Sequence, residues 1–95
     1  MTAGPFFTEA EVRELPSVQA VCAAFDADPG AGKMAPHNAA MLAAACDAAG
    51  VTLADFDRRI LGWLAGWEPE TVAVIASWIE RAYQAGKEAG RGTAE

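Results

Sequence analysis

The stretch 54–83, ADFDRRILGWLAGWEPETVAVIASWIERAY, decides the fold class, because two helical patterns follow each other within it. Large apolar residues recur at the three- and four-residue spacing of a helix face on both sides of a short break between Gly66 and Pro69. The first stripe comprises Leu53, Phe56, Ile60, Trp63, Leu64 and Trp67, and the second comprises Val72, Ile75, Ala76, Ile79, Ala82 and Tyr83. Since no part of the sequence alternates as a strand does, we predict an all-α protein.

The break between the two stripes predicts a helical hairpin in the C-terminal half of the chain. Glycine accepts the left-handed conformation that ends many helices, so Gly66 is expected to end the first helix in that conformation. Pro69 fits the first position of the next helix, where the backbone amide has no partner in any case. The hairpin would bury Phe56, Ile60 and Leu64 against Ile75, Ile79 and Tyr83.

Further helices are expected upstream of this stretch. The first opens at Thr8, which has capping-box spacing with Glu11, and Pro16 ends or kinks it. The second starts at Ser17 and ends before the loop 28–36, where two glycines and two prolines break the periodicity.

The remaining boundaries follow from caps and stops. The third helix covers residues 36–49, and Gly50 is its expected stop. Thr52 then caps the helix that carries the first stripe. The last helix is expected to end at Gly86, and the polar segment 87–95 is expected to be a disordered tail.

Length and composition limit the protein to one domain with a thin core. The chain has 95 residues, 53% of them apolar, but 23 are alanine and bury little surface. We therefore expect residues 1–86 to form a single small bundle of four to five helices that associates as a homodimer. The longest apolar runs reach about eight residues, against the roughly 20 of a membrane span, and residues 1–8 lack the features of a secretion signal. These patterns favour a cytoplasmic protein without a membrane segment.

The charge distribution disfavours a nucleic-acid partner. The net charge is −6, and residues 1–57 account for it, with eight acidic residues against Arg13 and Lys33. Nucleic-acid binding relies on basic surfaces that neutralise phosphates. An acidic N-terminal part instead favours solubility and a basic protein partner.

The sequence does not assemble a catalytic, metal or nucleotide site. The segment 27–34 matches a phosphate loop only in part, because Ala27 and Met34 replace its first glycine and its hydroxyl residue. His37 is the only histidine, and four zinc ligands at close spacing are missing. Cys46 lies on an apolar stripe and is expected in the core, although a Cys46–His37 catalytic pair stays open. We expect no metal, no cofactor and no enzymatic activity.

A helix-turn-helix is the specific alternative that fits the sequence best. Residues 42–61 can be laid on that motif, with Gly50 at its turn. The recognition helix would begin at Thr52 and present Arg58 and Arg59 to the DNA. Arg59 stands where an apolar residue is expected, and two aspartates on the same helix would repel phosphate.

Three tryptophans, Trp63, Trp67 and Trp78, are the candidate partner-binding residues. Trp63 and Trp67 are four positions apart and therefore share a helix face. Tryptophan dominates the energetics of many protein interfaces, so the cluster points to a partner or dimer face. Filling of a small core is the alternative explanation of the same cluster.

The stretch 54–83 also resembles short uncharacterised proteins of high-GC actinobacteria and their mobile elements. The residues that carry the resemblance are Asp57-Arg58-Arg59-Ile60, Trp63-Leu64, Trp67-Glu68-Pro69 and Thr71-Val72-Ala73-Val74. The resemblance covers about a third of the chain and implies a cytoplasmic accessory protein of the kind that phages or integrated elements encode. It implies no catalytic or binding residues.

These patterns together predict a small non-enzymatic protein-binding or regulatory accessory module that acts through helix-mediated contacts. The alternative is a small helix-turn-helix DNA-binding regulator. The two hypotheses differ in the surface they use, because the first relies on the tryptophans and the second on Thr52, Arg58 and Arg59.

Overall fold

Five helices make up the secondary structure of residues 4–30 and 32–93, the part of the chain that the computed structural model describes. They are α1 (Glu9–Arg13), α2 (Pro16–Ala27), α3 (Ala35–Ala48), α4 (Asp55–Leu64) and α5 (Pro69–Thr93). No strand occurs within the two described ranges, so the prediction of a small all-α bundle is confirmed.

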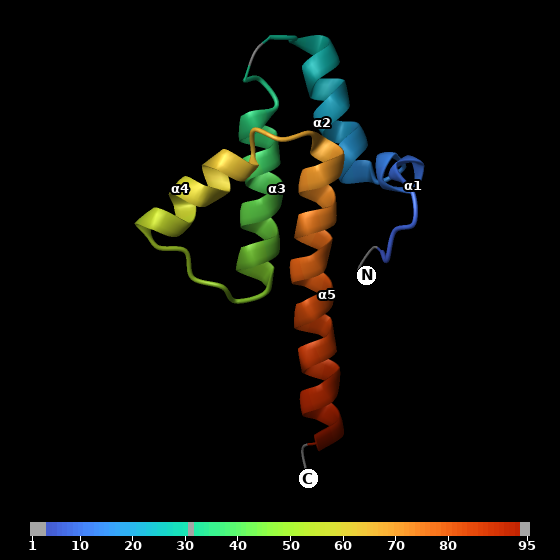
Figure 1. The fold of residues 1–95 in the computed structure, drawn as a ribbon, viewed down its shortest axis with the longest axis vertical. Coiled ribbons are helices and arrows are strands. Elements are labelled where there is room, and N and C mark those ends of the chain that lie inside the picture. Colours follow the sequence, from blue (N-terminus) through green and yellow to red (C-terminus); the bar gives the residue numbers. More distant parts are fainter. Residues whose placement is uncertain (1–3, 31, 94–95) are drawn as a thin grey trace.

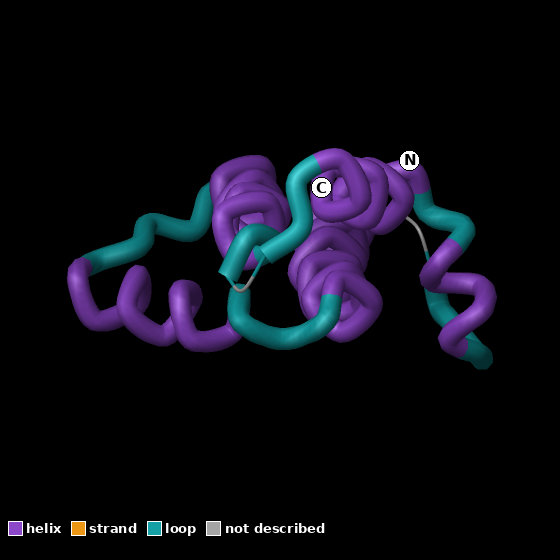
Figure 2. The backbone as a smooth tube through the Cα atoms, turned by 90° about the horizontal axis from the view of Figure 1, so that it is seen from above, coloured by secondary structure: helices purple, strands orange, loops and turns teal. Residues whose placement is uncertain are grey.

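Helices α3 and α5 lie side by side and form the centre of the molecule (Figure 1). Helix α4 packs on α3 at one edge, and α1 lies at the opposite edge. The view from above shows the helices spread into a thin layer (Figure 2), and the molecule measures 54 × 33 × 17 Å. The outer helices α1 and α4 therefore have neighbours on one side only.

Two apolar clusters hold this layer together. The first cluster joins α3 to α5 through the buried residues Leu42, Ala45, Val72 and Ala76. The second joins α1 and α2 to α5 through Val12, Val18 and Ala73. Three of these seven side chains are alanine, which brings helix backbones close together but buries little surface.

The beginnings of α1 and α2 follow the sequence prediction closely. The Thr8 hydroxyl accepts the backbone N–H of Glu11 over 3.3 Å, which is the expected capping interaction. The Glu11 carboxylate accepts the backbone N–H of Phe7 over 2.7 Å, one residue earlier than in a standard capping box. Pro16 is the first residue of α2, one residue before the predicted start.

The end of α3 is a Schellman motif centred on Gly50. This glycine has φ = +78°, as its predicted role as a helix stop requires. Its N–H donates to the carbonyl of Asp47 over 3.0 Å, and the N–H of Val51 donates to the carbonyl of Cys46 over 2.9 Å. These two hydrogen bonds define the motif and satisfy carbonyls at the end of the helix.

Helix α4 begins two residues later than predicted, so the assignment of Thr52 as its N-cap is wrong. Residues 51–54 form no helix, and Ala54 is the N-cap. The Asp57 carboxylate accepts the N–H of Ala54 over 3.0 Å. A side chain within the helix therefore caps the amide that precedes it, and the Thr52 hydroxyl is not needed for that purpose.

The turn between α4 and α5 does not use a left-handed glycine, so the predicted conformation of Gly66 is wrong. Among the described residues, the glycines with positive φ do not include Gly66. Its N–H donates to the carbonyl of Trp63 over 3.2 Å, and the N–H of Trp67 donates to that of Leu64 over 3.0 Å. The chain thus leaves α4 through tight right-handed turns, and Pro69 begins α5 as predicted.

The chain reverses direction between α4 and α5, but the predicted pairing of their faces is wrong in part. Three of the residues predicted to pack between the two helices are exposed, namely Phe56, Ile60 and Tyr83. Those that do pack around the first cluster are Leu64, Ile75 and Ile79. The physical reason is that α3, and not α4, covers the centre of α5, which leaves α4 at the edge of the layer.

Helix α5 continues past Gly86 to Thr93, so the predicted end at Gly86 is wrong. A single glycine in an exposed helix costs only about 1 kcal/mol relative to alanine. Ala85, Lys87 and Glu88 around it are good helix formers, so Gly86 does not force the helix to end. Residues 94 and 95 lie outside the described part, and disorder of the segment in solution stays a prediction.

Candidate interaction surface

Helix α4 presents a row of large apolar side chains to solvent. We define the apolar stripe as Phe56, Ile60, Trp63 and Trp67, whose exposed fractions are 68%, 42%, 63% and 51%. The intervals of four and three residues keep Phe56, Ile60 and Trp63 on one side of the helix, and Trp67, just beyond its end, stays beside Trp63 through a ring contact. Single exposed apolar residues are ordinary, whereas a contiguous row of them typically marks an interaction site.

The two tryptophans of the stripe support each other. The ring centroids of Trp63 and Trp67 are 5.9 Å apart, and the ring planes meet at 79°. Edge-to-face pairs of this kind contribute about 0.5–1.5 kcal/mol beyond the burial of their area. The contact limits the orientations of both rings, so this half of the stripe is held in shape before any partner arrives.

A different side of α4 attaches the helix to the core. Leu61 and Leu64 are half-buried and pack around the first cluster. The charged residues of the helix are all exposed, and they are Asp55, Asp57, Arg58 and Arg59. Helix α4 therefore uses one apolar side for folding, while the stripe remains open to solvent.

Asn38 of α3 positions the end of the stripe. Its side chain is fully buried, and its Nδ2 donates to the carbonyls of Ala65 and Trp67 over 3.0 and 2.9 Å. These carbonyls follow the last turn of α4 and have no partner within the helix. Asn38 thus ties the C-terminal end of α4 to the centre of the molecule, and with it the backbone of Trp67.

Asn38 is not among the residues predicted to have a role, although the sequence contains a signal for one. Asn38 lies four residues before Leu42 and seven before Ala45, so it belongs to the buried face of α3. A polar residue on such a face usually has a specific hydrogen-bonding role. Its two carbonyl partners, 27 and 29 residues further along the chain, were not predictable from local sequence.

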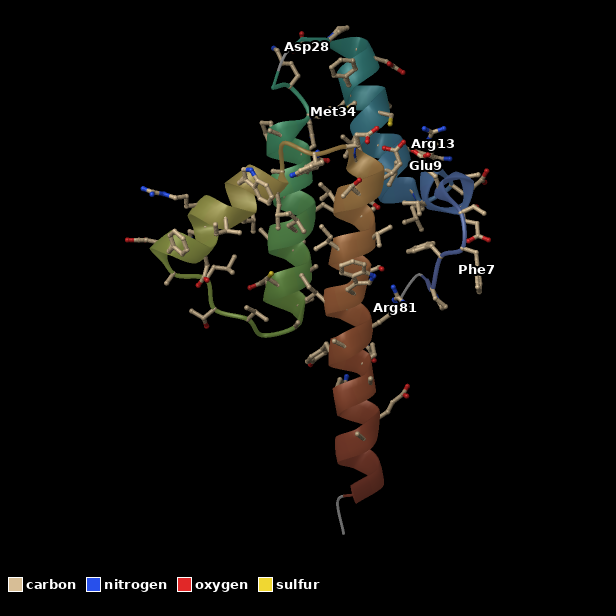
Figure 3. The ribbon with its side chains drawn as sticks, in the orientation of Figure 1. Phe7, Glu9, Arg13, Asp28, Met34 and Arg81 are labelled. Carbon is tan, nitrogen blue, oxygen red and sulfur yellow. The ribbon has the colours of Figure 1, made fainter. Side chains whose placement is uncertain are left out.

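Trp78 lies apart from the stripe. It is 59% exposed and lines a shallow groove on the α1 side of α5, together with Phe6, Val12 and Arg81. Figure 3 shows Arg81 on the side of α5 that the N-terminal segment passes. Of the three predicted tryptophans, the structure brings Trp63 and Trp67 together and places Trp78 elsewhere. A binding role for each of them stays a prediction.

The residues of the helix-turn-helix alternative are all exposed but do not sit on one recognition helix. Thr52 belongs to the link before α4, whereas Arg58 and Arg59 lie within α4. The link between α3 and α4 spans residues 49–54. That connection is longer than the roughly three to four residues that join the helices of such a motif.

A groove in which alanine is the commonest lining residue lies where α2, α3 and α5 meet. It has a volume of about 660 Å³, and we call it the alanine groove, after Ala20, Ala24, Ala40 and Ala44. His37 lies at this groove, whereas Cys46 is buried further along α3. Nine residues of one straight helix separate them by about 13 Å along its axis, so their side chains do not form a catalytic pair.

Arg13 joins α1 to the start of α5 through an ion pair. Its Nε donates to Glu70 Oε2 over 2.7 Å, and its Nη2 donates to Glu9 over 2.9 Å. Figure 3 shows Arg13 and Glu9 next to each other. The hydrogen bond from Arg13, followed by one from the backbone N–H of Glu70 itself, lowers the pKa of the Glu70 carboxyl.

The same region contains the carboxylates that could approach a cation. Ligand oxygens of Glu9, Glu68 and Glu70 lie within 4.8 Å of one another. Arg13 already donates to two of the three carboxylates and offsets part of their charge. The cluster is therefore explained as an ion-pair network between helices.

Within the described residues, none of the helices is both long and apolar enough to cross a bilayer. No family model, curated protein or solved structure matches this chain. The resemblance to short actinobacterial proteins therefore stays an expectation, and the surface must be interpreted from its own geometry.

Proposed function

We propose that this protein is a small non-enzymatic binding or regulatory module of the cytoplasm, which contacts a protein partner through the apolar stripe. The observation that carries the proposal is the exposure of Phe56, Ile60, Trp63 and Trp67 on one side of α4. The other apolar side of α4 already serves the core through Leu61 and Leu64, so the stripe is surplus to folding.

The size of the stripe supports a specific but moderate affinity. Its exposed area is about 500 Å², given the roughly 150–250 Å² of an aromatic side chain. At about 25 cal/mol per Å², covering it would contribute on the order of 10 kcal/mol before the costs of association. Those costs are roughly 4–15 kcal/mol, so the stripe needs a partner of good shape and some contacts at its rim.

The composition of the stripe also supports this role. Tryptophan is among the residues most enriched at the centres of protein interfaces. Trp63 and Trp67 sit in the C-terminal half of the stripe, where Asn38 holds the backbone in place. A preformed aromatic surface loses less conformational freedom on binding than a flexible one.

DNA binding is the alternative, and the exposure of Arg58 and Arg59 on α4 is the observation that favours it. Asp55 and Asp57 are exposed on the same helix and would repel phosphate. We therefore expect no sequence-specific DNA binding in a selection assay at about 50 mM salt, which favours any phosphate contact. A reproducible DNA motif that Arg58→Ala and Arg59→Ala abolish would favour the alternative instead.

A capture experiment in lysate of the native host tests the proposed function. The immobilised chain is compared with Trp63→Asp, on the stripe, and with Gly62→Asp, an adjacent exposed position where an added Cβ meets nothing within 4 Å. Circular dichroism verifies that both variants fold. Proteins retained by the unmodified chain and by Gly62→Asp, but not by Trp63→Asp, would support the proposal. Identical captures with all three baits would contradict it.

A further inference from the structure

We propose that the partner of the apolar stripe is a second copy of this chain, so that two α4 helices pack against each other in a symmetric dimer. The inference rests on the proposed function, because it names the occupant of the same surface. A two-fold axis lets one surface cover its own copy, and closed two-fold dimers are the commonest oligomers.

The spacing of the stripe suits a helix partner of the same kind. Phe56, Ile60 and Trp63 on α4 follow the alternating intervals of four and three residues that define a coiled-coil seam, and Trp67 continues the row just beyond the end of the helix. In such a seam, the side chains of one helix fill the holes between those of the other. A second copy of α4 supplies a seam of matching length and period.

The area of the stripe is close to what a stable dimer requires. Two stripes of about 500 Å² each would cover about 1,000 Å² in total, which is the approximate lower limit for a specific interface. Atoms at the rim of α4 would add to this area. A thin layer with two small clusters of core residues also gains stability from a second apolar contact.

The charges near the stripe permit contact between identical copies. The chain as a whole carries −6, but α4 carries Asp55 and Asp57 against Arg58 and Arg59 and has no net charge. Repulsion between copies therefore arises mainly outside the contact and is screened by salt. The dimer should hold or strengthen as salt rises, whereas binding of a strongly basic partner should weaken.

The alanine groove offers the other place where the stripe of a second copy could sit. That contact would join two different surfaces, so one stripe and one groove would stay open and the assembly would continue into rings or chains. The symmetric contact covers both stripes at once. The two arrangements make opposite predictions for Ala44→Glu, because Ala44 is exposed and lines the groove but lies outside the stripe.

Sedimentation equilibrium of the 95-residue chain tests the inference, at low and high salt and over a range of concentrations up to millimolar. We expect a monomer–dimer equilibrium in the unmodified chain, in Gly62→Asp and in Ala44→Glu. Trp63→Asp and Phe56→Asp should each weaken dimerisation by at least tenfold. Using two stripe variants one helical turn or more apart guards against a local folding defect in either one, and circular dichroism monitors folding.

Several results would overturn the inference. A strict monomer at all concentrations means that the stripe does not bind its own copy. A dimer that survives in both stripe variants, or that Ala44→Glu abolishes, places the contact elsewhere. The proposed function fails separately, since it depends on whether the captured proteins change with Trp63→Asp. A monomeric chain whose captures depend on Trp63 would leave a protein-binding module with a different partner.

Discussion

The side-chain amide of Asn38 donates to the main-chain carbonyl of Trp67 over 2.9 Å, and so connects the centre of the molecule to one end of the apolar stripe. A second bond from the same nitrogen reaches Ala65 over 3.0 Å. The residue that holds the proposed binding surface is thus on α3, far from that surface in sequence. Replacing it should affect both stability and the stripe.

Asn38→Ala should lower the free energy of unfolding by roughly 1–3 kcal/mol, because the buried carbonyl of Ala65 and the partly buried carbonyl of Trp67 lose their donor. Asn38→Asp should be at least as damaging, since a carboxylate cannot donate and would be buried. Urea titrations measure both variants, with the exposed Gln19→Ala as control. Wild-type stability in Asn38→Ala would show that the amide does not hold the turn.

Gly50→Ala and Gly66→Ala should lower the free energy of unfolding by different amounts. Gly50→Ala places a side chain at φ = +78° and should cost about 1 kcal/mol or more. Gly66→Ala should cost less, because Gly66 has no positive φ and its added Cβ would be 3.4 Å from the Trp63 carbonyl oxygen. Thermal melts of the two variants decide this. A larger fall in melting temperature for Gly66→Ala would contradict the right-handed turn between α4 and α5.

Side chains of the core and of the apolar stripe should differ in how much stability is lost when they are truncated to alanine. Leu42 is buried at 2% exposure, so Leu42→Ala should cost roughly 2–5 kcal/mol and unfold much of a small domain. Ile79 is partly buried beside the same cluster, and Ile79→Ala should fall at the lower end of that range. Phe56→Ala and Arg58→Ala should leave the melting temperature of the monomer nearly unchanged, because both side chains are exposed. If Phe56→Ala lowered the melting temperature as much as Leu42→Ala does, Phe56 would belong to the core.

Acid should remove the contribution of the Arg13–Glu70 pair. The pKa of folded Glu70 is lowered, so its ionised form contributes stability at pH values above the unfolded pKa of about 4.3. That contribution is lost as the pH falls through the lower pKa of the folded state. Urea midpoints from pH 7 downward should fall less steeply in Glu70→Gln than in the unmodified chain. Glu88→Gln, on the exposed end of α5, is the matched control and should follow the unmodified chain.

Local sequence signals predicted the helices and several of their ends. Thr8 caps the start of α1 and Gly50 ends α3, both as predicted, because helix capping depends on neighbours within a few residues. The predictions for Gly66 and Gly86 are wrong because a glycine permits the left-handed conformation without requiring it. The end of α4 depends on hydrogen bonds to its own last turn and to Asn38 instead.

The residues of the candidate site were predictable only in part, since Trp63 and Trp67 are predicted binding residues, whereas Phe56 and Ile60 are predicted to be buried in the hairpin and Trp78 lies apart from the stripe. Spacing put Phe56, Ile60, Trp63 and Trp67 on one face, and the structure keeps them there. Periodicity does not determine whether such a face is buried or exposed, because that depends on which of the other helices packs against α5. Here α3 covers the centre of α5, and the apolar stripe of α4 is left in solvent.

The indole N–H resonances of the tryptophans give the most direct test of the account. Side chains Trp63, Trp67 and Trp78 each contribute one resonance, assigned by single Trp→Phe variants, and each is followed as the protein is diluted from millimolar to micromolar concentration. We predict that the Trp63 and Trp67 resonances shift together along one dimerisation curve, while that of Trp78 stays fixed. Resonances of Trp63 and Trp67 that do not move with dilution, or movement of Trp78 alone, would contradict it.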